Sequence, residues 1–182
     1  MKHQKGFTFV EVIISLFIIS ILATIVAPSW VSFIQKQRVR IATDQVMRIL
    51  SEVQSEAKKT KTSISVEFKT IDGIPYFSKH HHNDKPNWKP LLNVFEIKPK
   101  QIDIFPQKYN KVITYNHIGA VSTSTQVPYT IKIAAPHRHA NPSYRKCVVV
   151  KTLLGAKEIG SKRSQCPTRK GATPTRGKIF YF

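Results

Sequence analysis

The chain has 182 residues, with 29 Lys or Arg against 10 Asp or Glu, which gives a formal net charge of +19 at pH 7. This basic excess favours acidic partners such as nucleic acid, anionic lipid head groups or acidic polysaccharide, with a solvated basic surface without a ligand as the alternative. The carboxylates are scattered, and the chain has no Gly-x-Ser-x-Gly, Walker or His-Glu-x-x-His motif, so the sequence gives no support for an enzyme.

An apolar run opens the chain. From Phe7 to Trp30 there are 24 residues, and Glu11 is the only formally charged one. As an α-helix the run is about 36 Å long, enough to cross a hydrocarbon core of about 30 Å. We therefore expect residues 7–30 to span a membrane. An ionised carboxylate at that depth costs roughly 2.5–3.5 kcal/mol, so Glu11 needs a partner.

The first six residues have the character of a basic leader. Lys2 and Lys5 precede the apolar run and should stay cytoplasmic by the positive-inside rule, and the small residue Gly6 stands at the junction. An ordinary secretory signal is cut after its apolar core, but no Ala-x-Ala-like site follows this one. Pro28 lies near the end of the run, where it removes a backbone hydrogen bond.

This combination resembles the type IV prepilin leader, so the chain is similar to type IV pilin-like proteins. The resemblance implies that prepilin peptidase cuts after Gly6 and that the new N-terminal residue, Phe7, is methylated. It also implies that Glu11 pairs with the N-terminal amine of a neighbouring subunit during filament assembly, and that Pro28 kinks the helix. The alternative is a plain single-pass anchor whose Glu11 faces a helical partner.

Residues 31–61 continue the helix with amphipathic spacing. Apolar side chains recur at three- and four-residue steps, while basic side chains can lie on other faces. The apolar members are Ile34, Ile41, Val46, Ile49, Leu50, Val53 and Ala57. We expect the first half of one long helix to lie in lipid or in a filament core and the second half to pack on a domain.

After Lys61 the pattern changes to the period of two that is typical of strands. Ile64 to Phe68 alternate, and Asp72-Gly73 supplies a turn before Ile74 to Phe77, which predicts a hairpin. Further strands are expected at Val94 to Lys98, Ile102 to Phe105, Val112 to His117, Tyr129 to Ala134 and Arg145 to Leu154. No further helix is indicated, so the predicted class is α+β: a long N-terminal helix on a mostly antiparallel sheet, which is the pilin fold by resemblance.

The predicted organisation has four parts: a leader at 1–6, a transmembrane or filament-core helix at 7–30, its amphipathic continuation at 31–61, and a β-rich domain with a basic tail at 62–182. About 150 residues after the anchor are enough for one domain with its own core. The tail ends in an apolar patch, residues 179–182, which we expect to add an edge strand or to tuck into the domain.

No metal or other cofactor is expected. His80, His81 and His82 fall in a stretch from Ser78 to Pro90 that has the composition of an exposed loop, and adjacent residues on a strand would point to opposite faces. The pair His137 and His139 is likewise interpreted as part of a solvated loop.

The two cysteines, Cys147 and Cys166, are expected to form a disulfide. If the leader is interpreted correctly, the domain faces an oxidising compartment, where two thiols are bridged more often than free. The bridge would close a 20-residue loop and stabilise the domain by about 3 kcal/mol. Metal ligation is the alternative, although two cysteines at this spacing make no zinc pattern without further ligands.

The segment from Arg145 to Gly155, with Cys166-Pro167 after it, is similar to the end of the GspH/FimT group of minor pilins and pseudopilins. Some members of that group bind DNA through a Gly-Arg-x-Arg turn and serve natural transformation. In this chain Gly155 is followed by Ala156-Lys157-Glu158, so the arginines of that turn are missing.

Ten basic residues and one acid, Glu158, nevertheless lie between Arg145 and Lys178. We therefore hypothesise phosphate contacts to DNA, from a loop and from the tail. The candidate residues are Lys157, Lys162, Arg163, Arg169 and Lys170.

The function predicted from the sequence is that of a non-catalytic minor pilin or pseudopilin. Its partners would be prepilin peptidase, other pilin or pseudopilin subunits, the inner membrane and DNA, and its domain would be periplasmic until it joins a filament. Type IV pilus and type II secretion machines both fit this prediction. The alternative is a single-pass membrane-anchored protein that binds another polyanion.

Overall fold

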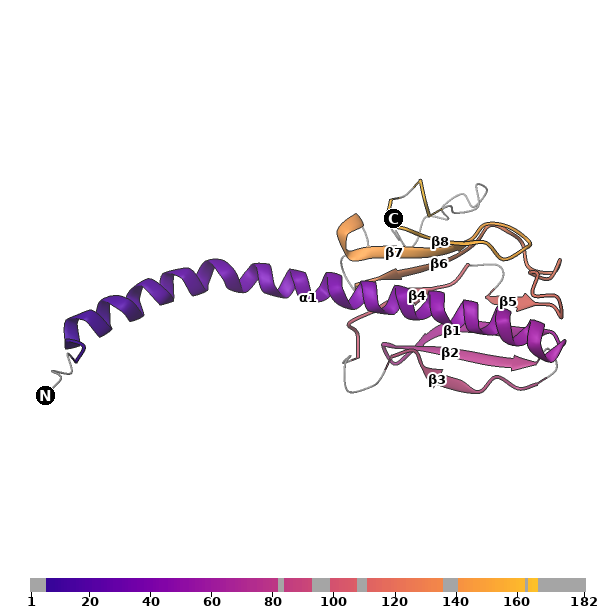
Figure 1. The fold of residues 1–182 in the computed structure, drawn as a ribbon, viewed down its shortest axis with the longest axis horizontal. Coiled ribbons are helices and arrows are strands. Elements are labelled where there is room, and N and C mark those ends of the chain that lie inside the picture. Colours follow the sequence, from indigo (N-terminus) through magenta and orange to yellow (C-terminus); the bar gives the residue numbers. More distant parts are fainter. Residues whose placement is uncertain are drawn as a thin grey trace, which may run out of the picture. The chain divides into compact units, whose positions relative to one another are not determined.

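The computed structural model describes residues 6–81, 84–92, 99–107, 111–135, 141–162 and 164–166, with the backbone alone for residues 25–29 and 142. The chain divides into two compact units, residues 1–34 and 35–182. One helix, α1 (Phe9–Thr60), belongs to both (Figure 1). This confirms the long N-terminal helix expected from the sequence.

The first unit consists of the N-terminal part of α1. The helix continues without interruption through Pro28. Among the described residues, no helix has the length and apolar character that crossing a membrane requires.

The described residues of the second unit form eight strands in two antiparallel sheets (Figure 1). The first sheet has the order β3-β2-β1-β5 and the second has the order β4-β6-β7-β8. The strands are β1 (Ile64–Ile71), β2 (Ile74–His81), β3 (Trp88–Pro90), β4 (Asp103–Phe105), β5 (Val112–Tyr115), β6 (Tyr129–Ala134), β7 (Arg145–Val150) and β8 (Lys157–Gly160). A short 3-10 helix, η1 (Pro142–Tyr144), precedes β7.

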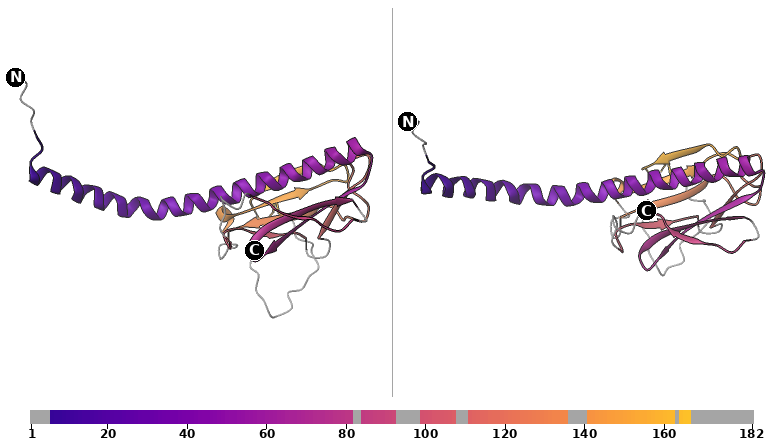
Figure 2. Two further views of the ribbon diagram at one scale, coloured as in Figure 1. Left: turned by 90° about the horizontal axis from the view of Figure 1, so that it is seen from below. Right: turned by 60° about the horizontal axis from the view of Figure 1, so that its bottom comes forward.

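Within this unit, the C-terminal part of α1 lies over both sheets (Figure 2). Its buried stripe repeats at three- and four-residue steps and meets the inward faces of both sheets in one core. The stripe is formed by Val39, Ala42, Val46, Ile49, Leu50, Val53 and Ala57. Ile41 was expected on this face but is 42% exposed, because the step of three or four residues from Val39 reaches Ala42 and Thr43 and leaves Ile41 off the stripe.

The predicted hairpin is confirmed. β1 and β2 pair in a register that places Ile71 opposite Ile74, so the connection is the two-residue turn Asp72-Gly73. Both turn residues have positive φ, 51° and 77°, which is the conformation that an Asp-Gly pair favours in such hairpins.

Three expectations about the strands were wrong. The loop expected from Ser78 to Pro90 contains the end of β2 and all of β3, because β2 pairs with β1 on one side and β3 on the other. The strand expected to run to Leu154 ends at Val150, where the chain turns into β8. Two sheets replace the single one that we expected. The strand predicted at 94–98 and the apolar patch at 179–182 lie outside the described residues.

Candidate functional site

The start of α1 is fixed by a side-chain cap. The Thr8 hydroxyl accepts a hydrogen bond from the Glu11 N–H at 3.3 Å, and the Thr8 carbonyl accepts one from the Val12 N–H at 3.2 Å. Thr8 therefore acts as the N-cap of the helix, with Glu11 at its third position. This role of Thr8 was not predicted from the sequence, although Thr-x-x-Glu is the signature of a capping box.

The carboxylate of Glu11 has no intramolecular partner among the described residues. The side chain is exposed, and the hydrogen bonds that the described residues make with Glu11 use only its backbone: its N–H donates to Thr8, and its carbonyl accepts from the Ser15 hydroxyl at 2.8 Å. Phe7, which precedes the cap, is also exposed. The site therefore offers a carboxylate on the first turn that is free to meet a cation from another molecule.

Gly6 stands in open space. A Cβ built at this position would meet no atom within 4 Å. The fold therefore places no steric demand for glycine at residue 6, and any requirement for a small residue there has to come from an external partner.

The helix surface around Glu11 is apolar on all sides. A helix with such a surface needs a cover of lipid or other helices. The exposed large apolar side chains here are Phe7, Phe9, Val10, Val12, Ile13, Ile14, Leu16, Phe17, Ile18, Ile19, Ile21 and Leu22. The hydroxyls of Ser15, Ser20 and Thr24 donate to carbonyls of the preceding turn, so these polar groups are satisfied within the helix.

The predicted disulfide is present. Cys147 on β7 is bonded to Cys166, and it ties the loop that follows β8 back to the second sheet. The same loop is closed by hydrogen bonds from the N–H groups of Gln165 and Cys166 to the Lys162 carbonyl, at 3.0 and 3.1 Å.

Lys157 was expected on a loop but lies on β8. Its ammonium donates to the side-chain oxygen of Gln54 on α1 and sits 5.7 Å from the centre of the Tyr115 ring. Burial, followed by the nearby charge of Lys58, lowers the pKa of Lys157. This engagement makes Lys157 a poorer candidate for a phosphate contact than the sequence indicated.

Of the other candidate basic residues, one lies in the described part of the chain and three lie outside it. Lys162 is exposed, as a phosphate contact requires. Arg163, Arg169 and Lys170 lie outside the described residues. The structure therefore places one exposed candidate, Lys162, in the described part of the chain.

Gln54 joins three segments that are distant in the sequence. Its side-chain nitrogen donates to the Gly119 carbonyl at 2.8 Å and to the Leu154 carbonyl at 3.0 Å, while its oxygen accepts from Lys157. Gly155 has φ of 82°, and a Cβ there would lie 2.5 Å from the Gln54 nitrogen. The turn between β7 and β8 is thus held against α1.

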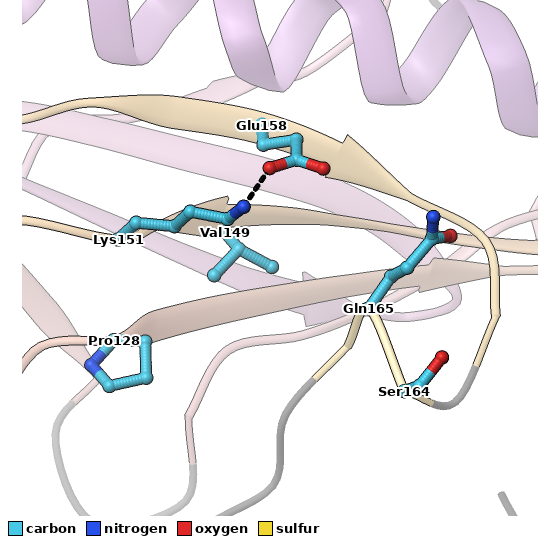
Figure 3. Close-up of a pocket in the computed structure, with 6 residues that line it drawn as sticks. All are labelled: Pro128, Val149, Lys151, Glu158, Ser164 and Gln165. Atoms are coloured by element: carbon cyan, nitrogen blue, oxygen red, sulfur yellow. Dashed lines mark ion pairs between the residues drawn. The ribbon is translucent and has the colours of Figure 1, made fainter.

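A hollow of about 400 Å³ lies on the outer side of the second sheet (Figure 3). Pro128 and Val149 supply apolar walls, and Ser164 and Gln165 supply polar ones. The ion pair between Lys151 and Glu158 also lines it, so the charges at its mouth neutralise each other. This arrangement provides no unpaired charge for a ligand among these side chains.

The histidines are not gathered into a metal site in the described part of the chain. His80 and His81 lie in β2, and the Nδ1 of His80 is 3.4 Å from the Ser78 hydroxyl. The described residues contain no group of three His, Cys, Asp or Glu that could hold a metal ion. His82, His137 and His139 lie outside them.

Comparison with known proteins gives a motif and a fold. Residues 1–27 match the family described as the prokaryotic N-terminal methylation motif. A crystal structure of the type IV minor pilin FimU from Pseudomonas aeruginosa is 14% identical, covers 74% of this chain and 96% of its own, and has a TM-score of 0.53. No curated protein matches the chain in sequence.

A structure of the minor pseudopilin EpsH from the type 2 secretion system of Vibrio cholerae is 14% identical, covers 66% of this chain and 94% of its own, and has a TM-score of 0.45. The likeness to FimU shows that the fold, a long helix on antiparallel sheets, is that of a pilin. Motif and fold together confirm the resemblance to type IV pilin-like proteins.

Proposed function

We propose that the chain is a filament subunit of the minor pilin or pseudopilin kind. Prepilin peptidase would cut after Gly6, and Phe7 would become the methylated N-terminus. One observation carries the proposal: the methylation motif coincides with a free carboxylate, Glu11, at the start of a helix that is apolar on all sides.

Assembly would follow from the electrostatics of that carboxylate. In the inner membrane, an unpaired ionised Glu11 is unfavourable, because lipid cannot solvate it. In a filament, the Phe7 amine of a neighbouring subunit lies in the same apolar surroundings and compensates the charge, which fixes the axial register between helices. The subunit would therefore pass from lipid to filament core with its domain on the periplasmic side.

The substitution Glu11→Val tests this proposal. Removing the carboxylate removes its desolvation cost, so the amount of protein in the inner membrane should stay the same or rise. Incorporation into sheared filaments should fall, since the neighbour's amine loses its partner. Ser20→Val on the same helix is the matched control and should be incorporated normally. Normal incorporation of the Glu11→Val chain would refute the assembly role.

Polyanion binding is a second candidate, favoured by the ten basic residues and one acid between Arg145 and Lys178. Contacts from Lys162, Arg163, Arg169 and Lys170 would bind DNA phosphates with little sequence preference. If about four phosphates are neutralised, the logarithm of the affinity should fall with that of the salt concentration at a slope of about −3.6.

Mobility shifts with the full chain in detergent at several salt concentrations test this candidate. The double variant Lys162→Glu, Arg163→Glu should bind more weakly and with a flatter salt dependence. The double variant Lys85→Glu, Lys89→Glu changes the net charge by the same amount, at two exposed lysines on and just before β3 of the other sheet, and serves as the control. Equal weakening by both variants would show that only the net charge matters and that this segment is not the site.

A further inference from the structure

Exposed aliphatic side chains of the β-rich unit are concentrated at one place. Among the described residues of the second unit, and apart from Ile41 (42%) on α1, the exposed large apolar side chains are Ile118 (62%), Leu153 (49%), Leu154 (80%) and Ile159 (37%). The first three lie on two neighbouring connections, β5 to β6 and β7 to β8, and we call them the tip patch. A group of this kind on an otherwise polar surface marks an interaction site.

Both connections that carry the tip patch are fixed by internal hydrogen bonds. The Asn116 side-chain oxygen accepts from the N–H groups of Ile118 and Ala120, at 3.2 and 2.9 Å. In the other connection, the Thr152 hydroxyl accepts from the Ala156 N–H at 3.2 Å. The aliphatic side chains are therefore presented on ordered turns.

The two connections are also fixed to each other. One nitrogen of Gln54 donates to the carbonyls of both Gly119 and Leu154, and the Val121 N–H donates to the Leu153 carbonyl at 2.6 Å. A surface that is ordered before it binds loses less conformational entropy on binding. This arrangement favours a specific partner for the tip patch.

Lys58 supplies an exposed positive charge at the edge of the tip patch. The Lys58 side chain packs on Gly119, since a Cβ there would lie 2.2–2.9 Å from three of its carbons. No ion pair of Lys58 occurs in the described part of the chain, whereas the ammonium of Lys157 is already held by Gln54. The first acid after this connection, Glu158 on β8, is paired with Lys151. A partner for this surface should therefore be acidic at its edges.

The adjoining strand offers backbone groups as well. β8 pairs with β7, and no second neighbour of β8 occurs among the described strands. An edge strand presents N–H and C=O groups that another strand can pair with, whereas lipid tails and DNA phosphates cannot complete such a ladder. The free edge next to exposed Ile159 therefore favours a protein partner.

We propose that the tip patch and the free edge of β8 bind an extended segment of another subunit of the same filament. That segment would place apolar side chains on Ile118, Leu153 and Leu154 and an acidic side chain near Lys58. The inference rests on the proposed function as a filament subunit and adds which surface of the domain meets a neighbour.

Photo-crosslinking in native cells tests this inference. The full chain would carry p-benzoylphenylalanine at position 154, or at position 89 on β3 as the control, and sheared filaments would be irradiated and analysed by mass spectrometry. At position 154 we expect an adduct with a second chain that carries the N-terminal methylation motif, at a segment with apolar and acidic residues. The substitution Leu153→Ser should reduce this adduct about tenfold, because it removes one buried leucine from the contact.

The possible outcomes separate the two proposals. A chain present in filaments, with no more adduct at position 154 than at position 89, overturns the inference alone. So does an adduct with lipid, with DNA or with residues 179–182 of the same chain. A chain that is absent from the filaments overturns the proposed function and this inference together.

Discussion

Two buried tyrosines illustrate how one hydrogen bond decides the effect of a substitution. Tyr115 and Tyr129 are both fully buried. The Tyr129 hydroxyl donates to the Lys111 carbonyl at 3.0 Å, whereas the Tyr115 hydroxyl has no partner among the described residues. A buried hydroxyl without a partner loses its hydration and gains nothing in return.

Tyr115→Phe should therefore leave the free energy of unfolding unchanged or raise it by up to about 1 kcal/mol at pH 7, while Tyr129→Phe should lower it by about 1 kcal/mol. Urea unfolding of the full chain in non-ionic detergent, followed by circular dichroism, measures both. A larger loss for Tyr115→Phe than for Tyr129→Phe would contradict the assignment of the hydrogen bond.

The same pair predicts the behaviour at alkaline pH. Burial raises the pKa of both phenols above the ordinary value of 10.0. The pKa of each phenol is higher in the folded than in the unfolded chain. The contribution of the two neutral phenols to the free energy of unfolding is therefore fully present below pH 10 and is lost as the pH rises above it. Each phenol then lowers the free energy of unfolding by about 1.4 kcal/mol per pH unit. Above pH 10, the two tyrosines together cause a decrease in the free energy of unfolding with pH, and Tyr115→Phe should halve that decrease. If the substitution left the pH dependence unchanged, Tyr115 would not be buried.

Gln54 shows where sequence reasoning fails at the scale of one residue. Its hydrogen bonds join residues 65, 100 and 103 positions away. A glutamine on a helix carries no local signal for such contacts, because they depend on which loops the fold brings to that turn of α1. Glu11 is the opposite case, since its neighbours in the sequence, the apolar run and Gly6, are enough to single it out.

At the scale of elements, local sequence patterns predicted the elements whose conformation their own residues favour, and they missed the elements that depend on distant neighbours. Asp72-Gly73 predicted the hairpin because the turn residues themselves favour positive φ. Strands β3 and β8 were not predicted because both are short edge strands with residues that are uncommon in strands. β3 contains Pro90, and β8 contains Lys157 and Glu158. Their strand character comes from pairing with β2 and β7, which periodicity along one segment cannot reveal.

The disulfide fixes the loop after β8, and its contribution can be measured. Reduction, or the double substitution Cys147→Ser, Cys166→Ser, opens a loop whose ends are 19 positions apart. The expected loss in free energy of unfolding is about 3 kcal/mol, mainly because the unfolded chain gains entropy. Denaturant unfolding with and without reductant measures it, and dithiothreitol should leave the double variant unchanged. An equal midpoint for the reduced and oxidised chains would contradict this prediction.

At the scale of the whole molecule, the chain combines an N-terminal helix whose surface is apolar with a basic β-rich unit that has its own core. The sequence predicted this combination because hydrophobic pattern and charge are properties of long segments. It did not predict two sheets in place of one, since the assignment of strands to sheets depends on non-local pairing. In the pilin fold, one helix supplies the apolar N-terminal segment and also packs on the sheets of the β-rich unit.

The most direct test of the proposed function is mass spectrometry of the N-terminus in sheared filaments from the native cell. The account predicts a chain that begins at methylated Phe7. Gly6→Val should accumulate uncut, although a larger side chain meets no atom of the fold at that position. A mature chain that retains Met1, or one that is cut beyond Trp30, would contradict the account.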